Sequence, residues 1–397
     1  MRILFLTPEL PYPPRGGGTI KSATVLAYLK REHDVDVACL ARSEWTEDQE
    51  AWAGKNGSVA TVRLQRERSA ANLVRSYAAG VPLSVLRNRS ALFAESVRRQ
   101  LNDRRYDAVF VDGWLMAQYL PPGFAGLKTL HQHNAEFVMW QRQASFESSL
   151  VRRVLVRREA GRVRRYESSI LGRFDVVFAV SEADRRALEG LDRATSRVEV
   201  LPNVPEPGLL DRPTLTPLGG DPVFLYLATL SWQPNLQGLR DFIRDALPLL
   251  RDRLPSARLV VAGRGVPPEL ARVAGKAEGV DLVGPFEDPE DLYERARAFV
   301  EVARGGSGTR LKLLNALARG LPAVTTPDGA EGLAIRPGMH ALVASSPAEF
   351  ADALACLAGE DHTWRALSEN GRQLIRARYV PEVAYRVLDE VFTRPAM

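Results

Sequence analysis

Residues 304–326 constrain the fold of this chain more than any other segment. The apolar run at residues 298–303 before the segment is typical of a buried parallel strand, and residues 323–325 at its end resume a strand. Between them, leucine and alanine recur at helical spacing. Glycine and proline mark the turns, at Gly305, Gly306, Gly308, Gly320 and Pro322. This order predicts a strand, a glycine loop, a helix that Gly320 caps, and a second strand of a parallel sheet.

The glycine loop and the helix start predict an anion site. Glycines let the backbone approach a ligand closely, and the free amides and dipole at a helix start attract negative charge. Arg310 and Lys312 lie in this first turn, where carboxylates are usual, so we expect a bound phosphate to compensate them. The alternative, a tight turn before an ordinary amphipathic helix, stays open because a single glycine loop is a weak signal.

Length and composition describe a globular protein of two domains. The chain has 397 residues, 45% of them apolar and 25% charged, with a net charge of +5. A modest positive charge fits an anionic ligand or an anionic membrane surface, with nucleic acid as the rival partner. Cys39 and Cys356 stand in apolar contexts, so we expect reduced core cysteines, and the sequence has no cluster of Cys and His typical of a metal site.

Strand-like and helix-like segments alternate twice along the chain, which predicts two parallel, doubly wound sheets. The expected strands are residues 2–6, 35–40, 59–64, 108–111, 127–130, 176–180 and 198–201, and then 223–228, 259–262, 280–283, 298–302 and 323–325. Proline and glycine are dense at residues 202–221, as in an interdomain linker. Helices are expected from residue 347 to about residue 392.

A second glycine loop, Gly16 to Gly18, follows the first strand, where open α/β sheets bind ligands. We expect Thr19 or Ser22 to cap the helix that follows. The spacing is not the dinucleotide fingerprint, so a nicotinamide enzyme is a poor fit. A plain structural turn is the alternative for each glycine.

Polar residues gather after the strand at residues 127–130. They are His131, His133, Asn134 and Glu136, at the carboxyl edge where the ligand crevice of such a sheet lies. A core role for His131 is the alternative.

Residues 141–173 are strongly basic. Their arginines are Arg142, Arg152, Arg153, Arg157, Arg158, Arg162, Arg164, Arg165 and Arg173, against Glu147, Glu159 and Glu167. Val151, Leu155, Tyr166 and Ile170 give this helical stretch a partial apolar face. A solvated face is the usual explanation, and a helix lying on an anionic membrane is the functional alternative.

The segment GSGTRLKLLNA at residues 306–316 resembles the donor site of glycosyltransferase family 4, in a subgroup with the signature GxGTRLKxLxA. The resemblance covers almost the whole chain and is most specific at residues 305–318, 231–235 and 133–136. It implies the GT-B fold, two Rossmann-like doubly wound domains facing a central cleft. The domains would be residues 1–203 for the acceptor, a linker at 204–221, residues 222–375 for the donor, and a helix at 376–397 crossing back to the first domain.

The resemblance also implies site residues. The catalytic ones would be His133, Arg310 and Lys312. The donor would contact Gly17, Gly18, Trp232, Asn235, Gly263, Arg264, Phe286, Gly306, Ser307, Gly308, Thr309, Asn315 and Glu331. The acceptor would contact His131, Asn134 and Glu136. Ser307 and Asn315 stand where many members have glutamate.

The implied activity is retaining, metal-independent transfer of a hexose from a nucleotide-sugar to a glycan, lipid-linked or small-molecule acceptor, without a cofactor. The apolar start at residues 3–6 is too short for a signal peptide, so we expect a cytoplasmic protein that is peripheral on the inner face of the membrane. A nucleotide-sugar epimerase of the same fold and a degenerate nucleotide-binding protein are the alternatives. Nucleic-acid binding is disfavoured, because no repeated aromatics interleave with the arginines. The base, sugar and acceptor stay open.

Overall fold

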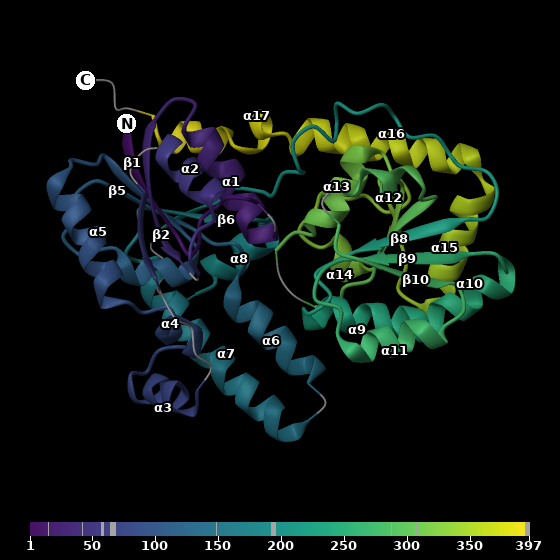
Figure 1. Ribbon diagram of the computed structural model, residues 1–397, viewed down its shortest axis with the longest axis horizontal. Coiled ribbons are helices and arrows are strands. Elements are labelled where there is room, and N and C mark those ends of the chain that lie inside the picture. Colours follow the sequence, from purple (N-terminus) through teal and green to yellow (C-terminus); the bar gives the residue numbers. More distant parts are fainter. Residues whose placement is uncertain are drawn as a thin grey trace. The chain divides into compact units, whose positions relative to one another are not determined.

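A computed structural model describes residues 1–14, 16–41, 43–56, 59–63, 69–147, 149–191, 196–286, 288–305 and 308–393 (Figure 1). The chain forms two compact units. Unit 1 consists of Met1–Pro202 and Ala384–Met397, and unit 2 of Asn203–Val383.

Unit 1 is built on a parallel sheet of seven strands in the order β3-β2-β1-β4-β5-β6-β7. Its strands are β1 (Arg2–Thr7), β2 (Asp34–Ala41), β3 (Val59–Arg63), β4 (Ala108–Asp112), β5 (Leu127–His131), β6 (Val176–Ala179) and β7 (Arg197–Val200). Its helices are α1 (Gly17–Leu29), α2 (Glu47–Lys55), α3 (Ala70–Ala78), α4 (Leu83–Arg87), α5 (Ala91–Asp103), the 3-10 helix η1 (Trp114–Tyr119), α6 (Glu136–Phe146), α7 (Leu150–Leu171), α8 (Glu182–Glu189) and α18 (Arg386–Val391).

Alternating side chains of β1 face opposite sides of this sheet. Leu4 and Leu6 belong to the core under α5 to α8, whereas the ring of Phe5 stacks on Phe110 of β4 with centroids 5.0 Å apart. On that second side Phe392, after α18, packs against Phe110. Both faces are therefore covered, as a fully buried parallel sheet requires.

Unit 2 has a six-stranded parallel sheet in the order β10-β9-β8-β11-β12-β13. Its strands are β8 (Val223–Leu227), β9 (Arg258–Ala262), β10 (Val280–Gly284), β11 (Ala298–Glu301), β12 (Ala323–Thr325) and β13 (Leu342–Val343). Its helices are α9 (Gln233–Asp241), the π-helical turn η2 (Phe242–Ala246), α10 (Leu247–Arg253), α11 (Pro268–Lys276), α12 (Glu290–Glu294), α13 (Leu311–Arg319), α14 (Pro327–Ala330), α15 (Pro347–Gly359) and α16 (Asp361–Arg378), with α17 (Pro381–Ala384) at its end.

Two hydrophobic cores lie on opposite faces of this second sheet. One contains Phe224 of β8 with residues of α9, α10 and α15, and the other contains Leu225 with residues of α13 and α16. In each unit the strand order reverses, between β1 and β4 and between β8 and β11. Ligands of doubly wound sheets bind at such switch points, outside the carboxyl ends of the strands.

The predicted α/β class with two doubly wound sheets is confirmed, and most predicted strands lie within a residue or two of their observed bounds. Gly320 ends α13 with φ of +83°, as its predicted capping role requires. Residues of the predicted linker pack within unit 2: Leu209 is buried, and the carbonyl of Leu210 accepts a hydrogen bond of 2.6 Å from Arg372. The chain rejoins unit 1 at Ala384.

Two local predictions were wrong, and one short strand was missed. Gly16, rather than Thr19 or Ser22, caps α1, because the side chain of Thr19 folds back onto the backbone of Gly16 and Ser22 bonds elsewhere. The basic stretch forms two helices, α6 and α7, because Ser149 caps a new start. The two-residue strand β13 was missed, since so short a strand carries no period.

The described residues include no helix that is both long and apolar enough to cross a membrane.

Candidate functional site

The switch point of unit 1 brings together the ends of β1, β4 and β5. The glycine loop and α1 follow β1, Asp112 ends β4, and His131 ends β5 directly opposite Asp112 in the strand register. His133 follows two residues later. Polar side chains that are distant in sequence thus converge at the edge where the topology predicts a ligand.

Asp112 is the centre of this cluster. Its side chain is fully buried, and its Oδ1 accepts hydrogen bonds from His131 Nδ1 at 2.8 Å and His133 Nε2 at 2.7 Å. Its Oδ2 accepts hydrogen bonds from the hydroxyls of Thr7 at 3.0 Å and Ser22 at 2.5 Å. Burial alone would raise the pKa of Asp112, but the two histidines outweigh it and hold that pKa below its ordinary value. The carboxylate is therefore ionised, with its accepting capacity filled.

These bonds fix which nitrogen of His133 faces outward. Nε2–H donates to Asp112, so Nδ1 is the remaining ring nitrogen. A Cβ built on Gly18 would lie 3.7 Å from this Nδ1, and the His133 side chain is 23% exposed. His133 thus presents Nδ1 beside the glycine loop, with access to solvent.

His131 has a different environment. It is completely buried, and burial lowers its pKa to about 3, so its ring is neutral. Its Nε2 has no hydrogen-bond partner among the described residues. The structure places His131 as an internal support of Asp112, which favours the core alternative over acceptor contact.

The loop after β5 is held by two carboxylates of later helices. Glu167 of α7 accepts the backbone amides of Glu136 and Phe137 at 3.0 and 2.7 Å, and Asp184 of α8 accepts that of Ala135 at 2.9 Å. Burial raises the pKa of Glu136 to about 7, and Asn134 donates to its carboxyl at 3.5 Å. Asn134 and Glu136 therefore lie beside His133 in a fixed loop.

The atoms of Asp112, His131 and His133 that can bind a metal ion lie within 4.8 Å of one another. Both histidines, however, contact the same carboxylate oxygen at hydrogen-bond distance, and hydroxyls occupy the other oxygen. Both carboxylate oxygens of Asp112 therefore already accept hydrogen bonds from neighbouring side chains, so the three residues do not fit a metal site well.

The switch point of unit 2 lies between β8 and β11, and the glycine loop after β11 begins there. Gly305 and Gly308 have φ of +67° and +79°, which glycine adopts without strain. The amide of Gly305 donates to Asp328 at 2.9 Å, and the buried guanidinium of Arg310 donates to the carbonyl of Gly305. Arg310 thus joins the two ends of the loop and lies 5.9 Å from the ring centroid of Trp232.

Lys312 lies in the first turn of α13, and its side chain is 29% exposed. Its ammonium group is 3.3 Å from the carboxylate of Glu206 and 5.6 Å from the ring centroid of Phe286. Asn315, one helical turn later, is fully buried. Its amide donates to Glu206 at 2.6 Å and accepts the backbone amide of Glu206 at 3.0 Å. Glu206 therefore joins Lys312 and Asn315 into one cluster.

Several of the other predicted donor residues follow strands of unit 2 and lie on the same carboxyl edge. Trp232 immediately precedes α9. The side-chain amide of Asn235, in the first turn of α9, donates a hydrogen bond to the carbonyl of Thr229. The hydroxyl of Thr309 accepts a hydrogen bond from Asn203. Gly263 follows β9, where a Cβ would collide with the carbonyl of Ala228, and the neighbouring Arg264 is exposed. Glu331 lies at the end of α14, and Gly17 is exposed at the start of α1 in the other unit. Gly306 and Ser307 lie outside the described residues.

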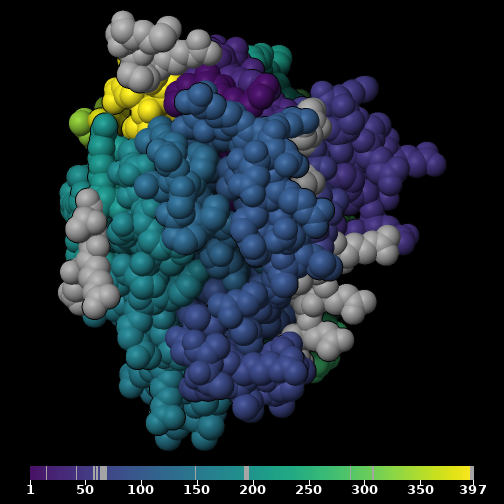
Figure 2. Space-filling view, turned by 90° about the vertical axis from the view of Figure 1, so that its left-hand side faces the viewer, coloured from purple at the N-terminus to yellow at the C-terminus, as the bar shows by residue number. Residues whose placement is uncertain are grey.

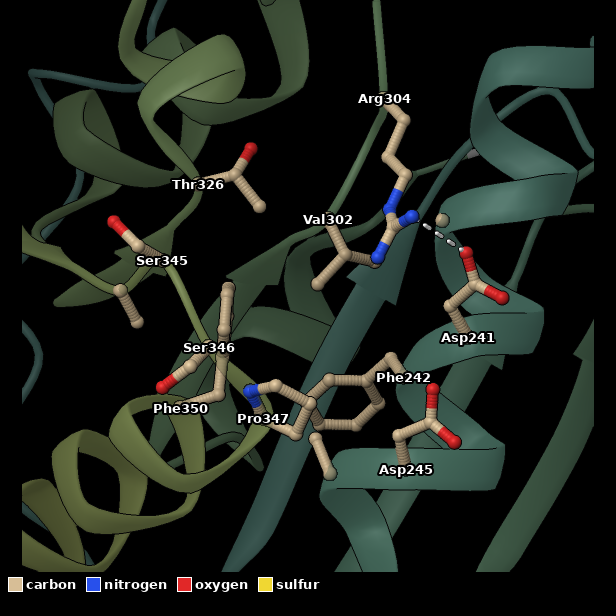
Figure 3. Close-up of a pocket in the computed structure, with 13 residues that line it drawn as sticks. Asp241, Phe242, Asp245, Val302, Arg304, Thr326, Ser345, Ser346, Pro347 and Phe350 are labelled. Atoms are coloured by element: carbon tan, nitrogen blue, oxygen red, sulfur yellow. Dashed lines mark ion pairs between the residues drawn. The ribbon is translucent and has the colours of Figure 1, made fainter. Parts of the chain in front are cut away.

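A small cavity of about 60 Å³ opens beside the start of the loop (Figure 3). In it the guanidinium of Arg304 points to Asp241 of α9, 3.2 Å away, so the charge of Arg304 is already compensated. Ligand pockets usually measure about 300 Å³ or more, so this cavity is too small for a nucleotide. The expected nucleotide site therefore does not coincide with this cavity.

Comparison with known proteins identifies both halves of the chain. Residues 16–204 match the family described as Glycosyltransferase Family 4, and residues 221–360 match the family described as Glycosyl transferases group 1. The chain is a GT-B glycosyltransferase.

Individual relatives of this glycosyltransferase are distant. An uncharacterized 44.6 kDa protein in the cps region of Klebsiella pneumoniae is 24% identical over 365 residues, which cover 88% of this chain and 89% of that protein. Sucrose-phosphate synthase from Thermosynechococcus elongatus has the same fold, with a TM-score of 0.71 at 17% identity, over 99% of this chain and 98% of that one. Anabaena Alr3699/HepE in complex with UDP and glucose aligns with a TM-score of 0.66 at 15% identity, over 99% of both chains.

Sequence reasoning missed several residues of these clusters in the glycosyltransferase. Asp112 carried a usable signal, because it ends a buried strand next to the strand of the histidines. Ser22, Glu206 and Asp328 carried none, since single polar residues in loops or helices reveal their partners only in three dimensions.

Proposed function

We propose that the protein is a retaining hexosyltransferase that moves a sugar from a nucleoside diphosphate sugar to a sugar-bearing acceptor. The observation that carries the proposal is the position of Lys312. Its ammonium group lies in the first turn of α13, at the switch point of unit 2, beside the ring of Phe286. The amides of a helix start and a cation form a suitable site for a diphosphate, and an aromatic ring can pack against a base.

The pair of Lys312 and Glu206 supports this assignment. The two side chains are 29% and 30% exposed, and an ion pair of such exposure contributes little stability. A diphosphate brings more negative charge than one carboxylate, so it can replace Glu206 as the partner of Lys312. The developing charge of the leaving diphosphate is then stabilised in the transition state.

His133 would act on the sugar side of the reaction. Asp112 holds its ring so that Nδ1 faces the glycine loop, where this acceptor nitrogen can take a hydrogen bond from a sugar hydroxyl. The proposal needs no cofactor and no metal ion, because Lys312, Arg310 and the amides at the start of α13 supply the positive charge. Retention of configuration rests on the family resemblance.

Ligands bound in structures of similar proteins support the choice of donor. Anabaena Alr3699/HepE was solved with UDP-glucose, and a neighbour from Escherichia coli with UDP-2-fluoro glucose. The relative in a cps region supports a role in polysaccharide biosynthesis. We place the enzyme in the cytoplasm, at the inner face of the membrane, with a glycan or lipid-linked acceptor.

Thermal shift with UDP, GDP, ADP and dTDP tests the donor site. A nucleotide at a hundred times its dissociation constant stabilises the folded state by about 2.7 kcal/mol. We expect at least one of the four nucleotides to stabilise the protein in this way. Lys312→Ala should lower the affinity for that nucleotide by about tenfold or more, because a charge-assisted contact is lost. Lys276→Ala, at an exposed position on α11, is the matched control and should bind as the parent does.

Turnover of a labelled nucleotide sugar, with and without a glycan acceptor, then tests the reaction. Transfer to the acceptor with the anomeric configuration kept supports the proposal. Epimerised sugar would favour the epimerase, and tight nucleotide binding without any turnover would favour the degenerate binding protein. Equal nucleotide affinities of Lys312→Ala and the parent would remove Lys312 from the site.

A further inference from the structure

The hairpin of α6 and α7 carries an apolar surface at its tip. We call this the tip surface; it consists of Phe146, Leu150, Val151, Val154 and Leu155. These side chains are between 49% and 72% exposed. Single exposed apolar residues are normal, but a contiguous group of this kind marks an interaction site.

The spacing of the tip residues places them on one side of α7. Positions 150, 151, 154 and 155 are one, three and four residues apart, which groups them on one helix face. The C-terminal half of α7 has a different role, because Val163, Ile170 and Leu171 are buried in the core of unit 1. The first turns of α7 thus extend beyond the part that the fold needs, with their apolar side chains uncovered.

Helix α3 adds to the same end of unit 1. Arg162 of α7 donates to the carbonyl and hydroxyl of Ser76, and its guanidinium lies 4.2 Å from the ring centroid of Tyr77. Leu73 and Val74 of α3 are exposed as well. Figure 1 shows α3 and the tip of the α6–α7 hairpin at the lower end of this unit, and Figure 2 shows both projecting there from a second direction.

Cations border the tip surface with little negative charge beside them. Arg152, Arg157 and Arg158 are exposed on α7, next to the apolar positions in sequence. The sequence from residue 146 to 161 holds only Glu147 and Glu159 as carboxylates, and Glu159 is buried against Arg162 at 2.7 Å. The net charge of the tip is therefore positive.

We propose that the tip surface docks on an anionic membrane, with its aliphatic side chains in the interface and its arginines at the lipid phosphates. Aliphatic side chains beside arginines suit this interface, where each nearby cation contributes about 1 kcal/mol. A second copy of the chain would bring arginines against arginines. Single-stranded nucleic acid would need stacking aromatics, and four of the five tip residues are aliphatic.

Co-sedimentation with vesicles tests the proposal on the full chain. The parent should bind vesicles of phosphatidylcholine with phosphatidylglycerol at low salt and should stay in solution with phosphatidylcholine alone. The double variant Leu150→Gln and Val151→Gln should bind at least about tenfold more weakly, because the two most exposed apolar side chains of the tip surface are lost. The triple variant Arg152→Gln, Arg157→Gln and Arg158→Gln should lose most of the salt dependence.

Leu92→Gln is the matched control, because Leu92 is 74% exposed on α5 of the same unit, away from the hairpin. It should bind vesicles as the parent does. Should the first double variant lower the melting temperature, Val154→Gln with Leu155→Gln repeats the test on the next turn. This proposal rests on the proposed location of the protein at a membrane. UDP titration of every variant is measured separately from vesicle binding. Failure of the membrane proposal therefore leaves the proposed nucleotide site intact, and failure of the nucleotide site leaves the membrane proposal intact.

Three results would overturn the proposal. The first is a parent that ignores anionic vesicles at low salt. The second is binding that both sets of tip variants leave unchanged, or that Leu92→Gln weakens equally. The third is concentration-dependent self-association of the parent that the Leu150 and Val151 substitutions abolish, which would make the tip an interface between copies.

Discussion

Asp112 shows how one buried residue can determine the chemistry of an exposed one. Asparagine at this position has the same shape but carries no charge, and its amide nitrogen cannot accept the hydroxyl protons of Ser22 and Thr7. We expect Asp112→Asn to lower kcat by about 100-fold, the usual scale for losing an oriented acid or base. UDP affinity, which the proposed function assigns to unit 2, should stay within a factor of about two.

Steady-state kinetics and UDP titration of Asp112→Asn measure the two effects. Asp175→Asn, on an exposed carboxylate of the same unit, is the control. Parent-like kcat in Asp112→Asn would mean that the cluster is purely structural.

Glu136 makes stability depend on pH. Burial raises its pKa to about 7 in the folded state, whereas in the unfolded chain the group ionises near its ordinary value. Between these values the unfolded chain has released a proton that the folded chain still holds, so stability falls as pH rises through this window and the loss is complete above about pH 7. The loss amounts to on the order of 3 kcal/mol.

Glu136→Gln removes this titration. Urea unfolding at about pH 5 and about pH 8 should show a smaller loss of stability with rising pH in the variant than in the parent. Equal pH dependence of the two proteins would show that the folded carboxyl titrates at its ordinary value.

At the scale of elements, the start of α1 offers a matched pair of glycines. Both are exposed, and neither has a positive φ. A Cβ at Gly18 would lie 3.7 Å from Nδ1 of His133, whereas a Cβ at Gly17 meets no described atom within 4 Å. We expect Gly18→Ala to raise KM or lower kcat by about tenfold, because it narrows the space that a ligand would share with His133.

Gly17→Ala should impair turnover less than Gly18→Ala in the same assay, because its Cβ meets no described atom within 4 Å. The melting temperatures of both variants should not fall, because alanine favours a helix over glycine. If both substitutions impair turnover equally, the loop itself touches the ligand at both positions. If neither does, the ligand does not approach His133 from this side.

Elements with a strong local signal were predictable from sequence. The strands, the glycine loops and the end of α13 at Gly320 follow from apolar runs and turn residues. The start of α1 was not predictable, because Gly16 takes the capping position that Thr19 or Ser22 was expected to hold. The boundary between α6, which ends at Phe146, and α7, which begins at Leu150, was missed, because no proline or glycine separates the two helical stretches in the sequence.

At the scale of the whole molecule, topology explains which site residues were predictable. Residues at the carboxyl ends of predicted strands, such as His133 and those of the Gly305 loop, follow once parallel sheets are inferred. The hydrogen-bond partners of such site residues cannot be predicted from the pattern of strands. Glu206 and Asn315 are 109 residues apart, and Ser22 and Asp112 are 90 apart, so only the folded chain brings them together.

The division of unit 1 into two chain segments leads to the last prediction. The returning segment supplies Tyr385, Leu388 and Phe392, each at most 1% exposed, and Asp389, which accepts a hydrogen bond of 2.7 Å from Tyr28. Burying each large apolar side chain contributes about 1.5–3 kcal/mol, so removing the segment should cost unit 1 at least about 4 kcal/mol. That is a large part of the 5–15 kcal/mol typical of a domain.

Truncation after Val383 should therefore lower the melting temperature of unit 1 sharply or unfold it, while unit 2 remains folded, because its segment is continuous and has its own two cores. Calorimetry of the truncated chain should show a separate transition that a bound nucleotide still raises. Truncation after Thr393, which keeps α18 and Phe392, is the control and should melt like the parent. Loss of both transitions on truncation after Val383 would show instead that the units fold as one cooperative body, in which the returning segment stabilises the nucleotide site as well as the sheet of unit 1.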